Sequence, residues 1–244
     1  LTNPYDKQPM GGFGELCASK YSFSREEQDA YAAESVRRAQ TAQAEGKFKA
    51  EIVPVIVAGK KGDTAIDQDE QPGRCNIEKI PTLKPAFKKD GTITAAASSS
   101  INDGAAALVL ASADKAKSLG AAPLARIVAH ATHSQAPEWF TTAPVGAIQK
   151  VLDKAGWTVD SVDLFEVNEA FAVVAMAPMR ELGIPHAKLN IHGGACALGH
   201  PIGASGARLI VTLLNALAQT GGRRGVAALC IGGGEATAVA IERL

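Results

Sequence analysis

The stretch "KLNIHGGACALGHPIGASGARLIVTLLNALAQTG" (residues 188–221) joins a short strand pattern to a helix pattern through a turn rich in glycine. Glycine weakens regular structure and is useful where the backbone must turn unusually or come close to another group. A second glycine cluster, "CIGGGE", follows about thirty residues later and again directly after a strand pattern. The sequence therefore predicts two turns at strand ends that approach a ligand.

Strand and helix patterns alternate on both sides of this stretch, and the strands are nearly all apolar. Strands are predicted over residues 105–112, 124–132, 163–167, 188–191, 225–233 and 235–244, and helices over 113–120, 145–156, 169–182 and 206–221. Apolar strands that alternate with helices indicate an α/β fold whose sheet is covered by helices on both faces. The strand over residues 105–112 is expected to be buried.

The first hundred residues differ from the rest because polar, turn-rich sequence dominates them. Ser24 and Glu27 have the spacing of a capping box and Gly46 is a natural helix stop, which predicts a helix over residues 25–45. A strand-like run, "EIVPVIV", follows, and then a loop-rich stretch from Gly59 to about Lys89. We expect two units: an accessory region over residues 1–100 and a compact core over 101–244.

The overall composition narrows the class of protein. The 244 residues carry 25 basic and 25 acidic side chains, and there is no basic stretch with interleaved aromatics, so nucleic acid is not an expected partner. No apolar run reaches the length of a membrane span. Four cysteines without paired spacing predict a reduced, intracellular protein, here assigned to the cytoplasm. The chain begins at Leu1 without an initiator Met, and we expect residues before it.

Three polar residues stand at predicted strand ends: Asn168 in "EVNEAFA", His200 in "LGHPIG" and Cys230 in "LCIGGGE". A histidine at the start of a helix can act as a base or donate to an oxyanion, and a cysteine before free backbone N–H groups can be reactive. Each also has a structural interpretation: a packing histidine, a buried cysteine and a helix-capping asparagine. Together they favour a ligand site, because α/β folds bind ligands at strand ends.

Other motifs of known chemistry are not matched. The sequence around Ser205, "GASGA", lacks the glycine spacing of the hydrolase nucleophile elbow. His130 and His133 in "HATH" lack the spacing of a helical zinc site, so no metal is expected. Phosphate-binding and dinucleotide-binding glycine motifs are also missing from the sequence. Nucleotide hydrolysis and NAD binding therefore have little support.

Three stretches in order and spacing closely resemble the C-terminal active-site motifs of thiolases, the acetyl-CoA acetyltransferase type in particular: "VNEAFA" (167–172), "GGACALGHPIGASGAR" (193–208) and "LCIGGGEATAVAIERL" (229–244). The upstream stretches over residues 24–40, 91–112 and 123–129 are also similar to that family. The resemblance implies the layered αβαβα thiolase fold, with this chain forming its C-terminal half and a CoA-binding loop region.

The resemblance also implies roles for individual residues. His200 would activate a nucleophilic cysteine and, with a water held by Asn168, would form one oxyanion hole. Cys230 would be the acid and base at the substrate α-carbon, and the backbone N–H of Gly232 would contribute to a second oxyanion hole. The implied reaction is the reversible Claisen condensation of two acetyl-CoA to acetoacetyl-CoA plus CoA. No cofactor beyond the substrate coenzyme A is implied.

The CoA-binding side would lie within residues 1–100. By position, Met10 and Ser99 resemble neighbours of the pantetheine, and Phe171 resembles a wall of the acyl pocket. Arg74 would be a partner for the nucleotide or its phosphates, or simply a solvated surface arginine. Dimers and tetramers are usual in the family, so a homo-oligomer is expected.

The sequence departs from the family pattern in two ways. The family's nucleophilic cysteine belongs to an N-terminal half that we expect to lie outside this chain, because Cys17, Cys75 and Cys196 do not match its motif. Pro9 stands where biosynthetic members often have a histidine and degradative members a proline. Two alternatives therefore stay open: a 3-ketoacyl-CoA thiolase of fatty acid oxidation, and a non-catalytic thiolase-like fragment that binds CoA or lipid.

Overall fold

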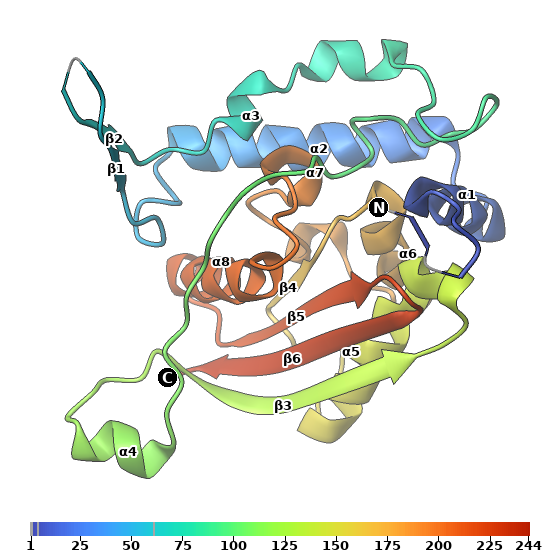
Figure 1. The fold of residues 1–244 in the computed structure, drawn as a ribbon. Helices are drawn as coiled ribbons and strands as arrows, with labels where there is room; N and C mark the ends of the chain where they lie inside the picture. Colours follow the sequence, from blue (N-terminus) through green and yellow to red (C-terminus); the bar gives the residue numbers. More distant parts are fainter. Residues whose placement is uncertain (1, 4, 61) are drawn as a thin grey trace.

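The computed structural model describes residues 2–3, 5–60 and 62–244 and places a four-stranded mixed sheet at the centre of the chain (Figure 1). The sheet consists of β3 (Ala125–Ser134), β6 (Glu235–Arg243), β5 (Arg224–Ile231) and β4 (Leu164–Val167), in that spatial order. β6 is antiparallel to both β3 and β5, and β4 is parallel to β5. The carboxyl ends of β4 and β5 therefore lie side by side, where a ligand site is expected.

Helices cover both faces of this sheet, and successive side chains of a strand point to one face and then the other. Phe165 and Val167 of β4 face one apolar cluster, with helices α5 (Ala143–Ala155) and α6 (Ala172–Leu182), whereas Leu164 faces a second cluster built on α8 (Ser205–Thr220). A strand with apolar residues at both odd and even positions has two apolar faces, and each face must be covered by helices. The predicted α/β class is confirmed.

A second layer of helices and loops lies over one end of the sheet (Figure 1). It contains α1 (Met10–Tyr21), α2 (Arg25–Ala44), the hairpin of β1 (Val55–Val57) and β2 (Thr64–Ile66), α3 (Gln71–Arg74) and the 3₁₀ helix η1 (Ile77–Thr82). The remaining elements connect the sheet: α4 (Ala113–Ser118), α7 (Ala195–Leu198) and the 3₁₀ helices η2 (Pro137–Thr142) and η3 (His186–Lys188).

The long helix α2 follows its sequence signals closely. The Ser24 hydroxyl accepts from the backbone N–H of Glu27 at 3.1 Å, and the Glu27 carboxylate accepts from the backbone N–H of Ser24 at 2.8 Å. This is the predicted capping box, which satisfies two free N–H groups at the helix start. Gly46 follows the helix end with φ +69°, a conformation that glycine adopts without strain.

Several predicted boundaries are wrong. Residues 105–112 form no strand and are largely exposed, because no neighbouring strand in the described part of the chain pairs with them. The strand predicted over 51–57 is reduced to β1, and the one over 188–191 to a single bridge between Phe165 and Leu189. Helix α1 was not among the predicted helices.

Candidate functional site

Asn168 and His200 meet at the end of β4. The Asn168 side-chain Nδ2 lies 3.3 Å from His200 Nε2, although the residues are 32 positions apart. Asn168 is fixed because its backbone N–H donates to Ala228 O at 3.0 Å, which continues the pairing of β4 with β5. His200 is held by its own N–H, which donates to Ser100 O at 3.0 Å. The structure thus brings together the first pair of predicted site residues.

Ser205 fixes the tautomer of His200. Its Oγ lies 2.6 Å from His200 Nδ1 and also donates to Pro201 O at 3.0 Å. Because the hydroxyl proton is directed to the carbonyl, Oγ accepts from an Nδ1–H. His200 Nε2 then carries the lone pair and can accept a proton from a substrate or a thiol.

His200 is kept in the neutral form. Burial lowers its pKa below the usual 6.5, and the positive charge of Arg208 acts in the same direction. Asn168 Oδ1, on the other side of the contact, is buried and has no hydrogen-bond partner among the described residues. A buried amide oxygen without a partner suits the binding of one water, which is the arrangement that the sequence resemblance implied.

Cys230 occupies the end of the neighbouring strand. It lies on the same face of β5 as Ala228, the residue that holds Asn168, and its side chain belongs to the large apolar cluster. Burial raises the pKa of its thiol to about 12. Cys230 is therefore protonated near neutral pH and can give up a proton rather than serve as a resting thiolate.

The glycine turn after Cys230 leaves room for Met10. A Cβ added to Gly232 would lie 3.1 Å from the methyl carbon of Met10, so helix α1 reaches the end of β5. Gly234 has φ +94°, and a Cβ there would lie 2.2 Å from Gln135 O. Glycine is required at Gly234 both by conformation and by the close approach of backbone.

Ser99 and Phe171 lie next to each other beside the same strand end. The Ser99 hydroxyl donates to Ala170 O at 3.1 Å, and the neighbouring Ser98 forms a bridge with Phe171. The Phe171 ring packs edge to face against Phe87, with ring centroids 5.7 Å apart. Four of the predicted site residues therefore lie around one end of the sheet: Met10, Ser99, Asn168 and Phe171.

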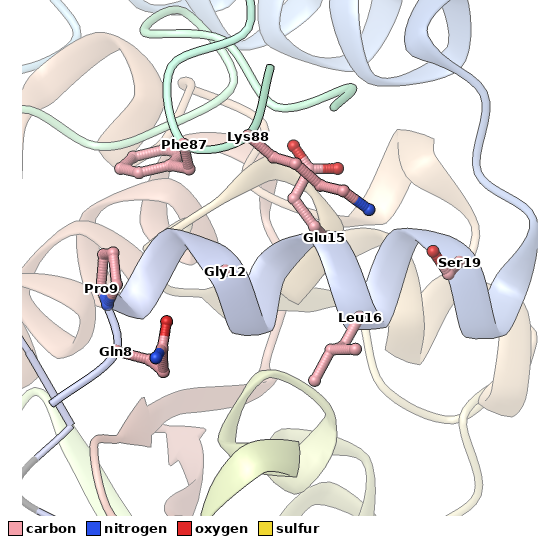
Figure 2. Close-up of a pocket in the computed structure, with 8 residues that line it drawn as sticks. All are labelled: Gln8, Pro9, Gly12, Glu15, Leu16, Ser19, Phe87 and Lys88. Atoms are coloured by element: carbon pink, nitrogen blue, oxygen red, sulfur yellow. The ribbon is translucent and has the colours of Figure 1, made fainter. Parts of the chain in front are cut away.

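A hollow opens along helix α1 next to these residues. Figure 2 shows Phe87 and Lys88 above the helix, with Pro9 and Gln8 at its start. The Glu15 carboxylate accepts from the backbone N–H groups of Thr92 and Ile93. A Cβ on Gly11 would lie 2.1 Å from the Phe87 ring, so a glycine is needed for the ring to rest on the helix. Phe87 is an aromatic wall that the sequence did not reveal.

The predicted Arg74 is not brought to this site by any contact of the described residues. Its side chain is 63% exposed and forms an ion pair with Glu70 at 2.9 Å. No cluster of three or more potential metal ligands occurs within residues 2–3, 5–60 and 62–244. No helix in the described part is both long and apolar enough to cross a membrane.

Ser205 is a candidate site residue that the sequence did not reveal. It was weighed only as a possible hydrolase nucleophile, where its glycine spacing failed. The informative signal was different: a hydroxyl residue five positions after His200, where helix α8 begins, can turn back to the imidazole.

Family models give the same picture over both parts of the chain. The model of the thiolase C-terminal domain matches residues 121–243, which is half of the chain, and that of the thiolase N-terminal domain matches residues 1–114. The chain belongs to the thiolase family. Residues 1–114 therefore belong to the N-terminal family domain, so the expectation that the N-terminal half lies wholly outside this chain is wrong in part. The expected division at residue 100 stays a prediction.

The thiolase relatives carry one recurrent name. The chain is 49% identical to acetyl-CoA acetyltransferase IA of Candida tropicalis and 51% identical to the acetyl-CoA acetyltransferase of Chromobacterium violaceum, over its whole length in both cases. It spans 61% and 62% of these relatives' own lengths.

Solved thiolase structures confirm the predicted fold. The acetyl-CoA acetyltransferase of Bacillus anthracis superposes with a TM-score of 0.96 at 41% identity, and human mitochondrial 3-ketoacyl-CoA thiolase with 0.92 at 38% identity. Each covers all of this chain, and the chain covers 62% of each. Two differently named thiolases share this fold closely, so the fold alone does not identify the acyl chain.

Proposed function

We propose that this chain carries the acid–base and oxyanion-binding residues of an acetyl-CoA acetyltransferase. The enzyme would join two acetyl-CoA to acetoacetyl-CoA plus CoA, or catalyse the reverse thiolysis. The observation that carries the proposal is the contact between Asn168 Nδ2 and His200 Nε2 at 3.3 Å, with Ser205 at 2.6 Å from the other ring nitrogen. The names of relatives about 50% identical support the same chemistry.

Proton transfer at the substrate α-carbon is assigned to Cys230. In thiolysis, the bond between the α-carbon and the β-carbonyl carbon breaks, and the thiol gives its proton to the departing carbanion. A thiol pKa raised to about 12 supports this direction, since the proton is present before the bond breaks. Condensation is the reverse: Cys230, as the thiolate left by that proton transfer, takes the α-proton, and the carbanion attacks the acyl thioester and releases its thiolate.

The acyl group would be held by a cysteine outside residues 1–244. The buried thiols of Cys17 and Cys196 donate to the carbonyls of Val173 and Glu169, and burial raises both pKa values. Cys75 donates to Gln71 O. None of these three sulfurs makes a hydrogen bond with His200 in the described part of the chain, which supports a nucleophile supplied by further sequence or a further chain.

Coenzyme A would be the only cofactor-like partner, through its acyl thioesters. Met10, Ser99 and Phe171 surround the strand end and are proposed to contact the pantetheine and acyl group. Arg74 remains a proposed nucleotide contact that would require its ion pair with Glu70 to open. We also propose that the protein forms a dimer or tetramer. Four free cysteines support a reducing compartment such as the cytoplasm.

Thiolysis of acetoacetyl-CoA tests this function, followed by loss of the enolate absorbance in the protein made from its full reading frame. Cys230→Ala is expected to lower kcat by about 100- to 10,000-fold, the usual contribution of general acid–base catalysis. An unchanged rate would remove Cys230 from the mechanism. A protein that binds CoA but has no thiolase activity before mutation would indicate the non-catalytic alternative.

A 3-ketoacyl-CoA thiolase of fatty acid oxidation is the second candidate. Pro9 favours it: this residue lines the hollow beside Phe87, at the position where the sequence resemblance associates proline with degradative members. Thiolysis rates for 3-ketoacyl-CoA of increasing chain length separate the two. A steep fall beyond four carbons supports the acetyl-specific enzyme.

A further inference from the structure

The buried carboxylate of Glu169 makes more contacts than a cap or packing residue requires. Its Oε1 accepts from Tyr31 Oη at 2.9 Å and from Asn190 Nδ2 at 2.7 Å. Its Oε2 accepts from Ser35 Oγ at 2.7 Å and from the backbone N–H of Cys196 at 3.0 Å. The side chain has no solvent exposure, so four donors replace the water that the charge has lost.

These contacts connect segments that are far apart in the sequence. Tyr31 and Ser35 belong to helix α2 of the accessory layer, and Cys196 belongs to α7, four residues before His200. Ser35 Oγ also accepts from the backbone N–H of Gly194 at 2.9 Å, and a Cβ on Gly194 would lie 2.3 Å from the Glu169 carboxyl carbon. The glycine turn therefore rests directly on the carboxylate.

We propose that Glu169 is a positioning residue that holds both halves of the Asn168–His200 contact. Asn168 is attached to it through the adjoining peptide bond, and His200 through α7 and the turn that begins at Gly194. One anion thus sets the separation of the two side chains. The inference rests on the proposed function, because it assumes that the contact acts in catalysis.

The two acceptor oxygens of Glu169, and not only the shape of its side chain, matter for this role. Asn190 cannot rotate its amide to suit a new partner, because Val167 N donates to its Oδ1 at 2.8 Å and its Nδ2 donates to Val167 O at 2.8 Å. The backbone N–H of Cys196 is fixed as well. In a Glu169→Gln variant the new NH₂ group faces a fixed donor in either orientation, namely Asn190 or Cys196.

Kinetics of acetoacetyl-CoA thiolysis in the protein from its full reading frame test the inference through a double-mutant cycle. Glu169→Gln alone is expected to lower kcat by about 10- to 100-fold, because an error of about 1 Å in a catalytic contact has this order of effect. The KM is expected to change less than kcat. In an Asn168→Ala background the same substitution should lower kcat by less than about threefold, since the contact that it positions is already lost.

A matched control is available at Glu181. This glutamate also accepts from a tyrosine hydroxyl, Tyr21 Oη at 2.9 Å, but it is exposed at the far end of α6. Glu181→Gln is expected to leave kcat within about twofold of the unchanged protein, as usual for a surface substitution. Thermal unfolding of each variant separates loss of fold from loss of positioning.

The outcomes distinguish the two proposals. Equal factors for Glu169→Gln in both backgrounds, or no loss of kcat at all, would overturn the positioning role. Absence of thiolysis in the unmutated protein, or an Asn168→Ala variant with full activity, would overturn the proposed function instead. If Glu169→Gln does not fold, Tyr31→Phe removes one of the four donors and is carried through the same cycle. A loss of kcat that is several-fold and depends on Asn168 supports the inference, and an Asn168-independent loss rejects it.

Discussion

Strand β5 and residues 105–111 have similar sequences but different structures. Both are short apolar runs rich in alanine, leucine and valine, "GVAALCI" in β5 and "AAALVLA" in the second segment. β5 lies between β4 and β6 and is mostly buried, whereas Val109 is 99% exposed and Leu110 73% exposed, with no strand formed. A strand therefore needs neighbours for its backbone N–H and C=O groups, and propensity alone does not supply them.

The difference extends to the elements around each run. Helix α8 packs on β5 and contributes Leu213 to a buried cluster, whereas α4, directly after the second segment, has no buried residue at all. Figure 1 shows α4 at the lower left, away from the sheet and the helices. Asn168, His200 and Cys230 all lie in the packed region.

The largest expected difference between the two regions is in the free energy of unfolding. Leu213→Ala is expected to lower the free energy of unfolding by about 2–5 kcal/mol, because Leu213 is fully buried against β5 and leaves a cavity. Leu110→Ala, the matched change in the exposed segment, should cost less than about 0.5 kcal/mol. Urea unfolding measures both. A large cost for Leu110→Ala in the protein from its full reading frame would sharpen the comparison, since it would show that other sequence covers this segment there.

A second effect of burial is a dependence of stability on pH. Glu166 of β4 lies 3.6 Å from Arg208, and burial raises its pKa from 4.5 to about 8 despite that positive charge. A pKa raised on folding contributes stability that is complete below pH 4.5 and is lost as the pH rises through 8. Between pH 4.5 and 8 we therefore expect the free energy of unfolding to fall in the unchanged protein, and above pH 8 this contribution levels off.

Glu166→Gln is expected to remove this slope, because the amide does not titrate. Urea unfolding at about pH 5, 6.5 and 8 measures it. The comparable substitution in the exposed region, Asp114→Asn, should leave the slope unchanged, since α4 buries no side chain. Equal slopes in the Glu166→Gln variant and the unchanged protein would contradict the assignment.

The sequence predicted which residues lie at strand ends and which of them meet, whereas their catalytic roles stay predictions. Asn168, His200 and Cys230 stand where an α/β sheet places ligands, and the capping box of α2 has a local signature. Ser205 was not predicted as the partner of His200, because the sequence around it was compared only with the nucleophile elbow of hydrolases.

Contacts between distant segments were beyond reach of the sequence. Glu169 meets Ser35 across 134 positions, and Gly194 meets Ser35 across 159. No local pattern records such pairs. The expected strand over residues 105–112 failed for the same reason: alternation and apolar content describe the strand, but its neighbours decide whether it forms.

A smaller effect is expected where the packed region fixes His200, a side chain proposed to act in catalysis. Ser205→Ala removes the acceptor of the His200 Nδ1–H and should lower kcat for thiolysis by about tenfold, equivalent to about 1.4 kcal/mol. Ser205→Thr keeps a hydroxyl and is expected to retain more activity than the alanine variant. Steady-state kinetics compare the two. Equal losses would point to the space around Ser205 rather than to its hydrogen bond.

The smallest expected effect is at the start of α4. The Ser112 hydroxyl accepts from the backbone N–H of Lys115 at 3.2 Å, a cap that typically contributes about 1 kcal/mol to its helix. Because α4 spans only Ala113–Ser118 and buries nothing, its loss does not expose apolar surface. Ser112→Ala should therefore leave the global free energy of unfolding within about 0.5 kcal/mol while it speeds amide hydrogen exchange within the helix. A cooperative loss of stability would mean that α4 is coupled to the sheet, and the two regions would then be one folding unit rather than two.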